Sequence, residues 1–577
     1  MRKFVCLLLA AAMLFLLTGC VGSVSASLAA TATSSASEEA SASSGGDLPA
    51  DPDAELSQEE DEQEEQPFTL GYYTGVSFNP YYCENTANQA IISLLFDPLV
   101  ELDEGFSVQP CLATSVTCKV SSASDEEEDE DGAASDTGDG EDDEDGEAQE
   151  DEEETKEKTY DTVTTVTIKL RTDVTFKDGT KLDADDVVYS LNQARSEGSI
   201  YYARLSRVKS VKAEDSSTVV LKVNGSNASF DRLLDIPIVK EGTGKDDLPT
   251  GTGAYRLRYD GDTPSYLEAN DSWWREETMP LETIPLYAAE DSDYLLYGFG
   301  SGTISLVTTD LTGTTSLSYH GNFQVADYAT TVMLFLGCNT KKGACATQKV
   351  RSAIYYALDR DTLVSKMLSG HGEATSLPIS PSAADYDAAL AETLSQDREK
   401  AADLLDGSYT GGSLTLIVNS DSSFKVSIAQ EIADELEGLG MDVTVETLSW
   451  SDFKEAVADG DYDLYLGEVQ LTADFGLDAF LEADGDQNPR GYSNSDLTDL
   501  YTAFCKASGE ARQEAAEALY TELADQAPFI PICFKCYSAL YQWNTLTSLT
   551  PTQHNLFYQF SGWTFASQAE ETEEQAS

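Results

Sequence analysis

The chain of 577 residues carries 35 Lys and Arg against 103 Asp and Glu, a formal net charge of −68. This excess of acid excludes a protein that binds duplex nucleic acid through its phosphates, and it excludes docking on anionic lipid through a basic patch. Residues 125–157 hold 21 of the acids, and residues 21–66 hold 12 with no basic residue. Such segments cannot bury a core, so the rest of the chain is expected to fold, in about three domains or lobes.

The N-terminal segment has the pattern of an exported lipoprotein. Arg2 and Lys3 precede the apolar run Phe4–Leu17, which fits a secretory signal and is shorter than the roughly 20 residues that span a bilayer. The run ends in Leu-Thr-Gly-Cys, which resembles a bacterial lipobox and predicts lipidation of Cys20. We therefore expect residues 1–20 to be a lipoprotein signal peptide, with a plain secretory signal as the alternative. Lipid anchoring would place the protein at the outer face of the cell membrane.

The segment after the signal, 21–66, is expected to be a disordered acidic tether. Alternation over Thr164–Leu170 predicts a half-buried strand, and Asp183 is expected to cap a helix from 184 to about 195. The acidic segment 121–161 falls between two strand-like pieces and is interpreted as a disordered insert in a hairpin. Such an insert costs little, because the closure entropy of a loop grows only logarithmically with its length.

Spacing of apolar residues predicts a long amphipathic helix over 349–367. Residues 413–466 then have the pattern of three strands separated by two helices, with strands at 414–418, 443–448 and 463–467, a first helix ended by Gly440 and a second that begins at a Ser451 cap and ends at Gly460. This order implies a parallel sheet covered on both faces. Helices are expected to fill 496–526, and a strand is expected at 530–540.

Eight cysteines remain after Cys6 and Cys20, and outside the membrane an even number is interpreted first as disulfides. Short spacings make two pairs the candidates, Cys338 with Cys345 and Cys111 with Cys118. Cys533 and Cys536 have the spacing of a redox or zinc pair, but only three histidines are present and no second such pair, so no metal site is predicted. No nucleophile, phosphate-loop or metalloprotease motif occurs, which argues against a secreted hydrolase and against any catalytic residue or cofactor.

Several segments together are similar to a known family. Thr165–Arg171, Val174–Gly179 and Leu182–Val187 resemble the signature of the extracellular solute-binding proteins, family 5, the dipeptide-, oligopeptide- and nickel-binding components of ABC importers. The similarity extends over nearly all of 67–565 and includes Phe78–Pro80, Pro249–Tyr255, Leu267–Asn270, Trp273–Trp274, Gly337–Thr340, Val350–Ala353 and Ala357–Arg360.

The resemblance implies an α/β, two-lobed periplasmic-binding-protein-like fold with hinge strands and an additional subdomain on the first lobe. The expected divisions are 67–270 for lobe 1, 271–525 for lobe 2, 526–566 for the return to lobe 1, and 567–577 for a disordered tail. A ligand would close the lobes around itself, and the closed monomer would dock on an ABC permease and ATPase complex without chemistry of its own.

The family pattern also suggests binding residues. Asp474 stands where peptide binders often place an Asp that pairs with the α-ammonium group of the peptide, and Glu84, Asn85 and Thr86 correspond to a segment that can line the cleft. Glu468 stands where some oligopeptide binders have a base that faces the ligand carboxylate. A peptide is the first choice of ligand. A nickel chelate, a sugar or another small solute remains open, as does a sensor that presents a signalling peptide to a membrane partner.

Overall fold

The computed structural model describes residues 67–124, 159–314, 317–543 and 545–566, and all of these belong to one compact unit, Glu65–Ser577. The expected signal peptide, Cys20, the tether 21–66, most of the acidic insert and the tail 567–577 lie outside the described residues. The described part is mixed α/β, with two large hydrophobic cores and one small satellite core. The two large cores define two lobes, in agreement with the expected fold class.

The first lobe contains the larger share of the strands. Its part of the main sheet runs in the order β11-β1-β10-β9-β8, with β1 parallel to both β10 and β11. Helix α2 packs on β1. The elements concerned are β1 (Leu70–Tyr73), α2 (Thr86–Leu95), β2 (Val100–Leu102), β3 (Val108–Pro110), β8 (Tyr255–Asp260), β9 (Thr263–Ala269), β10 (Thr283–Ala289), α5 (Ser292–Gly300), β11 (Leu306–Thr309), β18 (Leu546–Ser548) and β19 (Thr564–Phe565).

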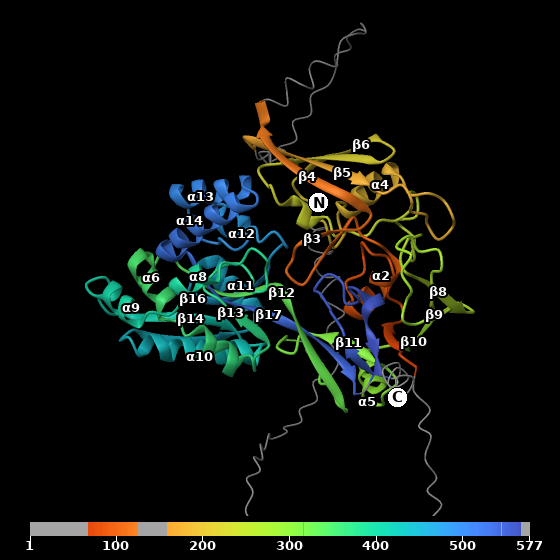
Figure 1. Ribbon diagram of the computed structural model, residues 1–577. Coiled ribbons are helices and arrows are strands. Elements are labelled where there is room, and N and C mark those ends of the chain that lie inside the picture. Colours follow the sequence, from red (N-terminus) through yellow and green to blue (C-terminus); the bar gives the residue numbers. More distant parts are fainter. Residues whose placement is uncertain (1–66, 125–158, 315–316, 544, 567–577) are drawn as a thin grey trace, which may run out of the picture. The chain divides into compact units, whose positions relative to one another are not determined.

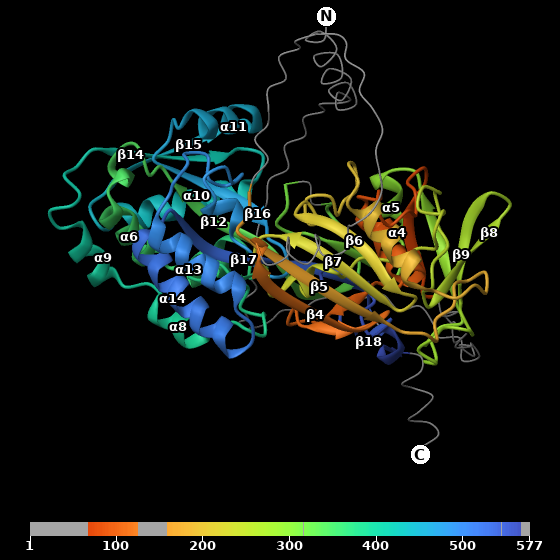
Figure 2. The ribbon, with the colours of Figure 1, turned by 90° about the horizontal axis from the view of Figure 1, so that it is seen from above.

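A separate antiparallel sheet forms the subdomain of the first lobe. Its strand order is β4-β5-β7-β6, and α4 lies against β6 and β7 (Figure 2). Asp183 caps α4 as predicted: its side chain accepts from the backbone N–H of Asp185, and the Asp186 side chain accepts from the N–H of Asp183. The elements are β4 (Ala113–Ser122), β5 (Thr162–Leu170), α4 (Ala184–Ala194), β6 (Val208–Asp215), β7 (Thr218–Asn224) and the short η1 (Phe230–Leu233).

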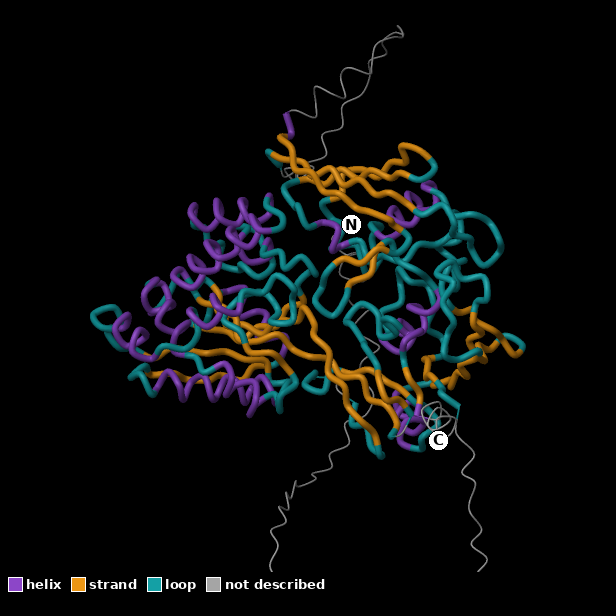
Figure 3. Tube along the Cα trace, viewed as in Figure 1, coloured by secondary structure: helices purple, strands orange, loops and turns teal. Residues whose placement is uncertain are grey.

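The second lobe is helix-rich around a short parallel sheet (Figure 3). Strand β14 pairs parallel with β15 on one side and with β16 on the other, so the predicted β-α-β-α-β order is confirmed. The cap of the second helix is Ser449 rather than Ser451. The elements are α6 (Gln348–Ala357), α7 (Arg360–Thr362), η3 (Leu363–Met367), β13 (Gly372–Ala374), α8 (Ala388–Thr393), α9 (Arg398–Leu405), β14 (Ser413–Asn419), α10 (Ser423–Glu437), β15 (Asp442–Leu448), α11 (Trp450–Asp459), β16 (Leu464–Gln470), α12 (Asp478–Leu481), α13 (Ser495–Lys506) and α14 (Glu510–Gln526).

The long helix predicted over 349–367 is interrupted. Helix α6 stops at Ala357, and the chain begins again at α7, where the Asp359 side chain accepts from the backbone N–H of Thr362. A side chain that competes for backbone donors in this way favours a new helix start over a continuous helix. The apolar period alone did not reveal the break.

Two long antiparallel strands, β12 (Phe323–Cys338) and β17 (Phe529–Gln542), join the lobes (Figure 1). The first half of β12 pairs with the second half of β17 in the first lobe, next to β11. The second half of β12 pairs with β16 and with the beginning of β17 in the second lobe. The register shifts between Ala329 and Met333, and such an irregularity lets a strand pair bend and twist. The chain thus enters the second lobe through β12, later than the expected boundary at residue 271, because β10 and β11 pair with β1.

We expect the acidic insert to be dispensable for folding. Ser122 and Thr162, which bracket it, are direct partners across β4 and β5, and the backbone N–H of Ala123 donates to the carbonyl of Asp161 at 2.9 Å. The hairpin is therefore already closed at the base of the insert. Replacing 125–157 by a short Gly/Ser turn should leave the melting temperature within a few degrees, measured by circular dichroism.

The control for this deletion is Val166→Asp, which places a charge at a fully buried position of β5 and should unfold the subdomain. If the deletion variant lost secondary structure as the control does, the insert would contribute to the fold and the expectation would be wrong.

Candidate functional site

A cavity with a volume of about 890 Å³ lies beside the hinge strands. Most of its wall comes from the first lobe, from β1, α2, β11 and the segments around 200–204, 235–237 and 552–556. Glu468 and Gln470 on β16 come from the second lobe, and Tyr328 and Tyr537 come from the two hinge strands. The cavity therefore has contributions from both lobes and from the connection between them, which is where a ligand could influence their closure.

Three residues expected at the cleft lie on the cavity wall. Glu84, Asn85 and Thr86 stand at the beginning of α2, and the Asn85 side chain accepts from the backbone N–H of Asn88 at 3.1 Å, which makes it the cap of that helix. Glu84 is exposed. The remaining N–H groups of the first turn give this part of the wall a partial positive charge, and the helix has no acid in its first turn.

Glu468 also lies on the wall, and its carboxylate is held by two lysines. Lys425 lies 2.9 Å from it, and Lys535 on β17 lies 3.6 Å from it. Lys535 is only 2% exposed and pairs in addition with Asp310, a second acid of the cavity wall. A buried ammonium group needs such partners, because an uncompensated charge is costly in the interior. Lys535, which belongs to a hinge strand, thus pairs with one acid from each lobe.

Two tyrosines of the hinge strands, Tyr328 and Tyr537, also line the cavity. Burial, followed by the charges of Asp310 and Glu468, raises the pKa of Tyr537 to about 12. Burial raises the pKa of Tyr328 to about 12, and its hydroxyl lies 2.5 Å from that of Thr308. Both phenols therefore remain neutral at ordinary pH and can offer hydroxyl groups to a ligand.

A second charged group on the wall comes from three distant segments. Arg204 Nη1 lies 2.5 Å from Asp235 Oδ1, and His554 Nδ1 lies 2.6 Å from Asp235 Oδ2. All three residues line the cavity. Burial would raise the pKa of Asp235, but the charges of Arg204 and His554 outweigh it and hold the pKa below its usual value. Asp235 is therefore ionised throughout the physiological range.

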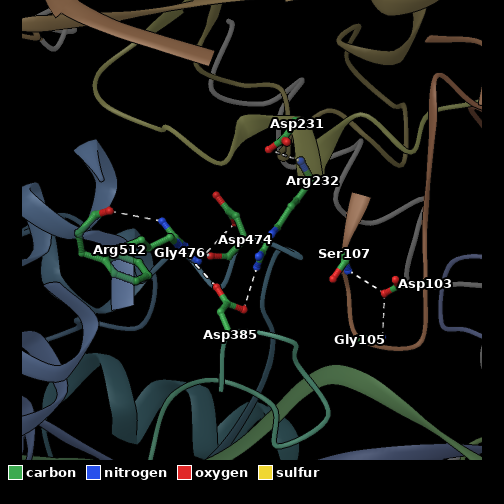
Figure 4. Close-up of polar contacts among 10 residues, drawn as sticks. Asp103, Gly105, Ser107, Asp231, Arg232, Asp385, Asp474, Gly476 and Arg512 are labelled. Atoms are coloured by element: carbon green, nitrogen blue, oxygen red, sulfur yellow. Dashed lines mark hydrogen bonds and ion pairs between the residues drawn. The ribbon is translucent and has the colours of Figure 1, made fainter. Parts of the chain in front are cut away.

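Asp474 lies apart from the cavity wall, at the junction of the two lobes (Figure 4). It is 6% exposed, and its carboxylate accepts from the Thr472 hydroxyl at 2.5 Å, from Asn227 Nδ2 at 2.7 Å and from the backbone N–H of Gly476 at 3.3 Å. Asn227 belongs to the first lobe, so one of these contacts crosses between the lobes. The Asp474 carbonyl accepts from Arg512 at 2.7 Å.

Other contacts cross the junction nearby. Arg232 lies 3.2 Å from Asp385, to which Arg512 also points at 3.7 Å (Figure 4). Arg207 lies 3.0 Å from Asp478 and 2.7 Å from Glu482.

The junction also contains uncharged contacts. The backbone N–H of Ala228 donates to the Cys505 carbonyl at 2.8 Å, and the rings of Phe106 and Phe475 meet edge to face at 5.4 Å. At this junction the first lobe is thus held to the second by charge pairs, hydrogen bonds and an aromatic contact.

The predicted disulfides are not formed, and all eight cysteines of the described residues are free thiols. Cys118 lies well inside the extended strand β4, roughly 20 Å along the chain from Cys111 at about 3.3 Å per residue, and a disulfide needs Cα atoms within about 7 Å. Cys111 instead accepts from Arg275 at 3.1 Å. Cys338 and Cys345 are both buried in the core of the second lobe, and burial raises the pKa of both thiols.

The sequence reasoning did not identify Arg204, Asp235, Asp310, Lys535 or His554 as wall or network residues. Lys535 had a signal, since it is a single lysine within the apolar run of β17. Asp235 had a comparable signal, as the single acid in the apolar run 233–239. Arg204, Asp310 and His554 stand in segments with no distinctive pattern, and only the fold brings them together. Among the described residues, no cluster of His, Cys, Asp or Glu is arranged to hold a metal ion, and no helix has the length and apolarity needed to cross a membrane.

The sequence matches one protein family and is similar to two binding proteins. The family model for bacterial extracellular solute-binding proteins, family 5 Middle, matches residues 108–488, which is more than half of the chain. The oligopeptide-binding protein AppA of Bacillus subtilis is 25% identical over 334 residues, which cover 51% of this chain and 60% of that protein. Heme-binding protein A of Haemophilus influenzae is 23% identical over 411 residues, which cover 63% of this chain and 74% of that protein. The chain thus spans less than two thirds of the length of AppA.

A solved structure agrees over nearly its whole length. The ABC transporter substrate binding protein CtaP of Listeria monocytogenes superposes with a TM-score of 0.63 at 19% sequence identity, covering 86% of this chain and 99% of that one. At this identity the superposition supports the fold alone, and it supports the two-lobed arrangement joined by β12 and β17.

We expect the Lys535 network to be important for stability. Lys535→Met keeps the length of the side chain but leaves Asp310 without its buried partner, whereas Glu468 keeps Lys425. Breaking a buried pair in this way should lower the free energy of unfolding by about 3–5 kcal/mol, measured by urea denaturation. The matched control is Lys342→Met, an exposed partner of Asp461, which should cost at most about 1 kcal/mol. Equal effects of the two changes would contradict the assignment.

Proposed function

Because the chain belongs to the bacterial extracellular solute-binding proteins, family 5, we propose that it is the ligand-binding component of an ABC importer and captures peptides between its two lobes. The observation that carries the proposal is the cavity, whose wall is built by both lobes and both hinge strands. Its volume of about 890 Å³ lies within the range of about 300–1,000 Å³ of ligand pockets. Because one ligand would touch both lobes, its binding energy would favour their closed arrangement.

The register shift in β12 supports a hinge at that position. The β12–β17 ladder shifts register across residues 330–332 and again between Leu334 and Phe335, so the lobes can rotate about this stretch while the ladders within each lobe persist. In the proposed cycle the closed protein, as a monomer, delivers its ligand to a membrane permease powered by an ATPase. Lipidation of Cys20 would keep the protein at the outer face of the cell membrane, with residues 21–66 as the tether.

A peptide is the proposed ligand class. The relative AppA is named for oligopeptides, and the wall of this cavity carries acids, bases and phenol hydroxyls suited to a zwitterionic chain with a polar backbone. Asp474 lies outside the cavity wall, at the junction of the lobes, and it would receive the α-ammonium group of a peptide that extends from the cavity into this junction. The Asn227 amide now donates to Asp474 at 2.7 Å. The ammonium group of the ligand would take the place of this donor.

The proposal is tested by identifying what the protein carries. The full chain, purified from its own host without added ligand and then denatured, should release peptides detectable by mass spectrometry. Release of a tetrapyrrole, a metal chelate or a sugar in their place would contradict the peptide assignment. A sensor of the same fold would bind peptides too, and the two roles are separated by uptake: deleting the gene should abolish peptide import if the protein serves a transporter.

We expect Asp474→Ala to weaken peptide binding. In the closed protein the carboxylate and the ligand ammonium would be largely desolvated, and removing one partner of such a pair costs about 3–5 kcal/mol. The dissociation constant for a recovered peptide should therefore rise at least about a hundredfold, measured by isothermal titration calorimetry. The control is Asp442→Ala, an exposed position at the beginning of β15, which should change nothing.

The alternative role of Asp474 is purely local, since its carboxylate already accepts from Thr472, Asn227 and Gly476. In that case Asp474→Ala would lower the melting temperature and leave the dissociation constant as it was. That result would end the assignment of Asp474 to the ligand.

A further inference from the structure

The group formed by Arg204, Asp235 and His554 has an unusual charge balance. One carboxylate uses both of its oxygens on two basic side chains, at 2.5 Å to Arg204 and 2.6 Å to His554. The side chains of Arg204, Asp235 and His554 are 20%, 6% and 13% exposed, so the acid is the innermost member. When the imidazole is protonated, two positive charges face one negative charge, and one positive charge is left over at the cavity wall.

Both basic groups keep capacity that Asp235 does not use. A guanidinium has five N–H donors in a planar fork, and only Nη1 of Arg204 contacts Asp235. Its plane lies over the ring of Tyr201, with the guanidinium carbon 5.2 Å from the ring centroid, which limits its orientations. His554 Nε2 is buried and has no hydrogen-bond partner, although the other ring nitrogen is paired. A buried polar atom without a partner is costly, so a group that completes it would bind favourably.

The other charged side chains of the wall are acids, and three of them are paired with bases of the protein. Glu101 pairs with Arg275 at 2.6 Å, and Asp310 and Glu468 pair with Lys535. Glu84 is exposed at the beginning of α2. An anionic group of a ligand would be repelled near any of these acids. The Arg204 and His554 side of the cavity is therefore where a negative group is best accommodated.

We propose that Arg204 and His554 form a subsite that receives a carboxylate of the ligand, with Asp235 as a positioning residue that holds both. The guanidinium fork matches the two oxygens of a carboxylate, and His554, whose Nδ1 faces Asp235 at 2.6 Å, supplies a further donor from Nε2 when its ring is protonated. Asp235 accepts from Nδ1 and so directs the other ring nitrogen away from itself. For a peptide this carboxylate is the C-terminal one, so the inference rests on the proposed function and specifies which end of the peptide lies here.

The test compares peptide acids with their amides. The probe is a synthetic mixture of random tri- to hexapeptides, prepared once as free acids and once as C-terminal amides, and captured on the full chain for quantification by mass spectrometry. The wild type should retain the acids at least about tenfold better than the amides, as expected for a charge-assisted hydrogen bond. Arg204→Gln should bring the ratio close to one, and His554→Gln should lower it severalfold. Arg258→Gln, which removes a partly exposed base of β8 that pairs with Glu268, is the control and should leave the ratio unchanged.

A structural role of the group alone would lower the melting temperature of the variants without changing the ratio of acid to amide, and that result would overturn the inference. If Arg204→Gln does not fold, Arg204→Lys keeps the charge but loses the fork, and it should retain only part of the preference for acids. Equal capture of acids and amides by the wild type would overturn the subsite while leaving peptide binding intact. Failure to capture any peptide would overturn the proposed function and this inference with it.

Discussion

The pairing of β12 with β17 is the constraint on which the other features depend. These two strands carry the main sheet from one lobe into the other, and the ladder between them is interrupted at residues 330–332. At that point side chains satisfy backbone groups that the ladder leaves unpaired. The Thr330 hydroxyl donates to the Lys535 carbonyl at 2.7 Å, and the Thr331 N–H donates to the Gln553 side chain at 2.7 Å. Buried backbone groups need partners, so a break in the ladder is stable only where such substitutes exist. The break in the ladder is thus stabilised by specific side chains.

The same position concentrates charge. Lys535 lies in β17 opposite this break. Its ammonium group pairs with Asp310 of the first lobe and with Glu468 of the second. An ammonium in this place opposes the repulsion between two carboxylates that face one cavity, and it does so from the strand that joins the lobes. The acids of the wall are therefore tied to the geometry of the hinge. Any change in the angle between the lobes changes the distances within this network.

The sequence predicted elements with strong local signals. The Asp183 cap and the β-α-β-α-β order of the second lobe follow from local spacing and were confirmed. The helix over 349–367 was predicted too long, because the apolar period continues across the Asp359 cap. The Cys111–Cys118 pairing failed because spacing along the chain says nothing about an extended strand between the two residues. Of the residues that the family pattern suggested for the site, Glu84, Asn85, Thr86 and Glu468 line the cavity and Asp474 does not. Arg204, Asp235 and His554 could not be predicted as a group, since their contacts arise only from tertiary folding.

The order of the strands also determines when the first lobe can be completed. The whole second lobe is inserted between β12 and β17, and the residues that follow β17 return to the first core, where Phe557, Phe560, Trp563 and Phe565 are buried. Phe68 meets Phe565 edge to face at 5.3 Å. During synthesis the first core therefore stays open until the second lobe has left the ribosome. A ribosome that stalls after α14 would leave a chain with an exposed apolar surface, the kind of species that chaperones and proteases recognise.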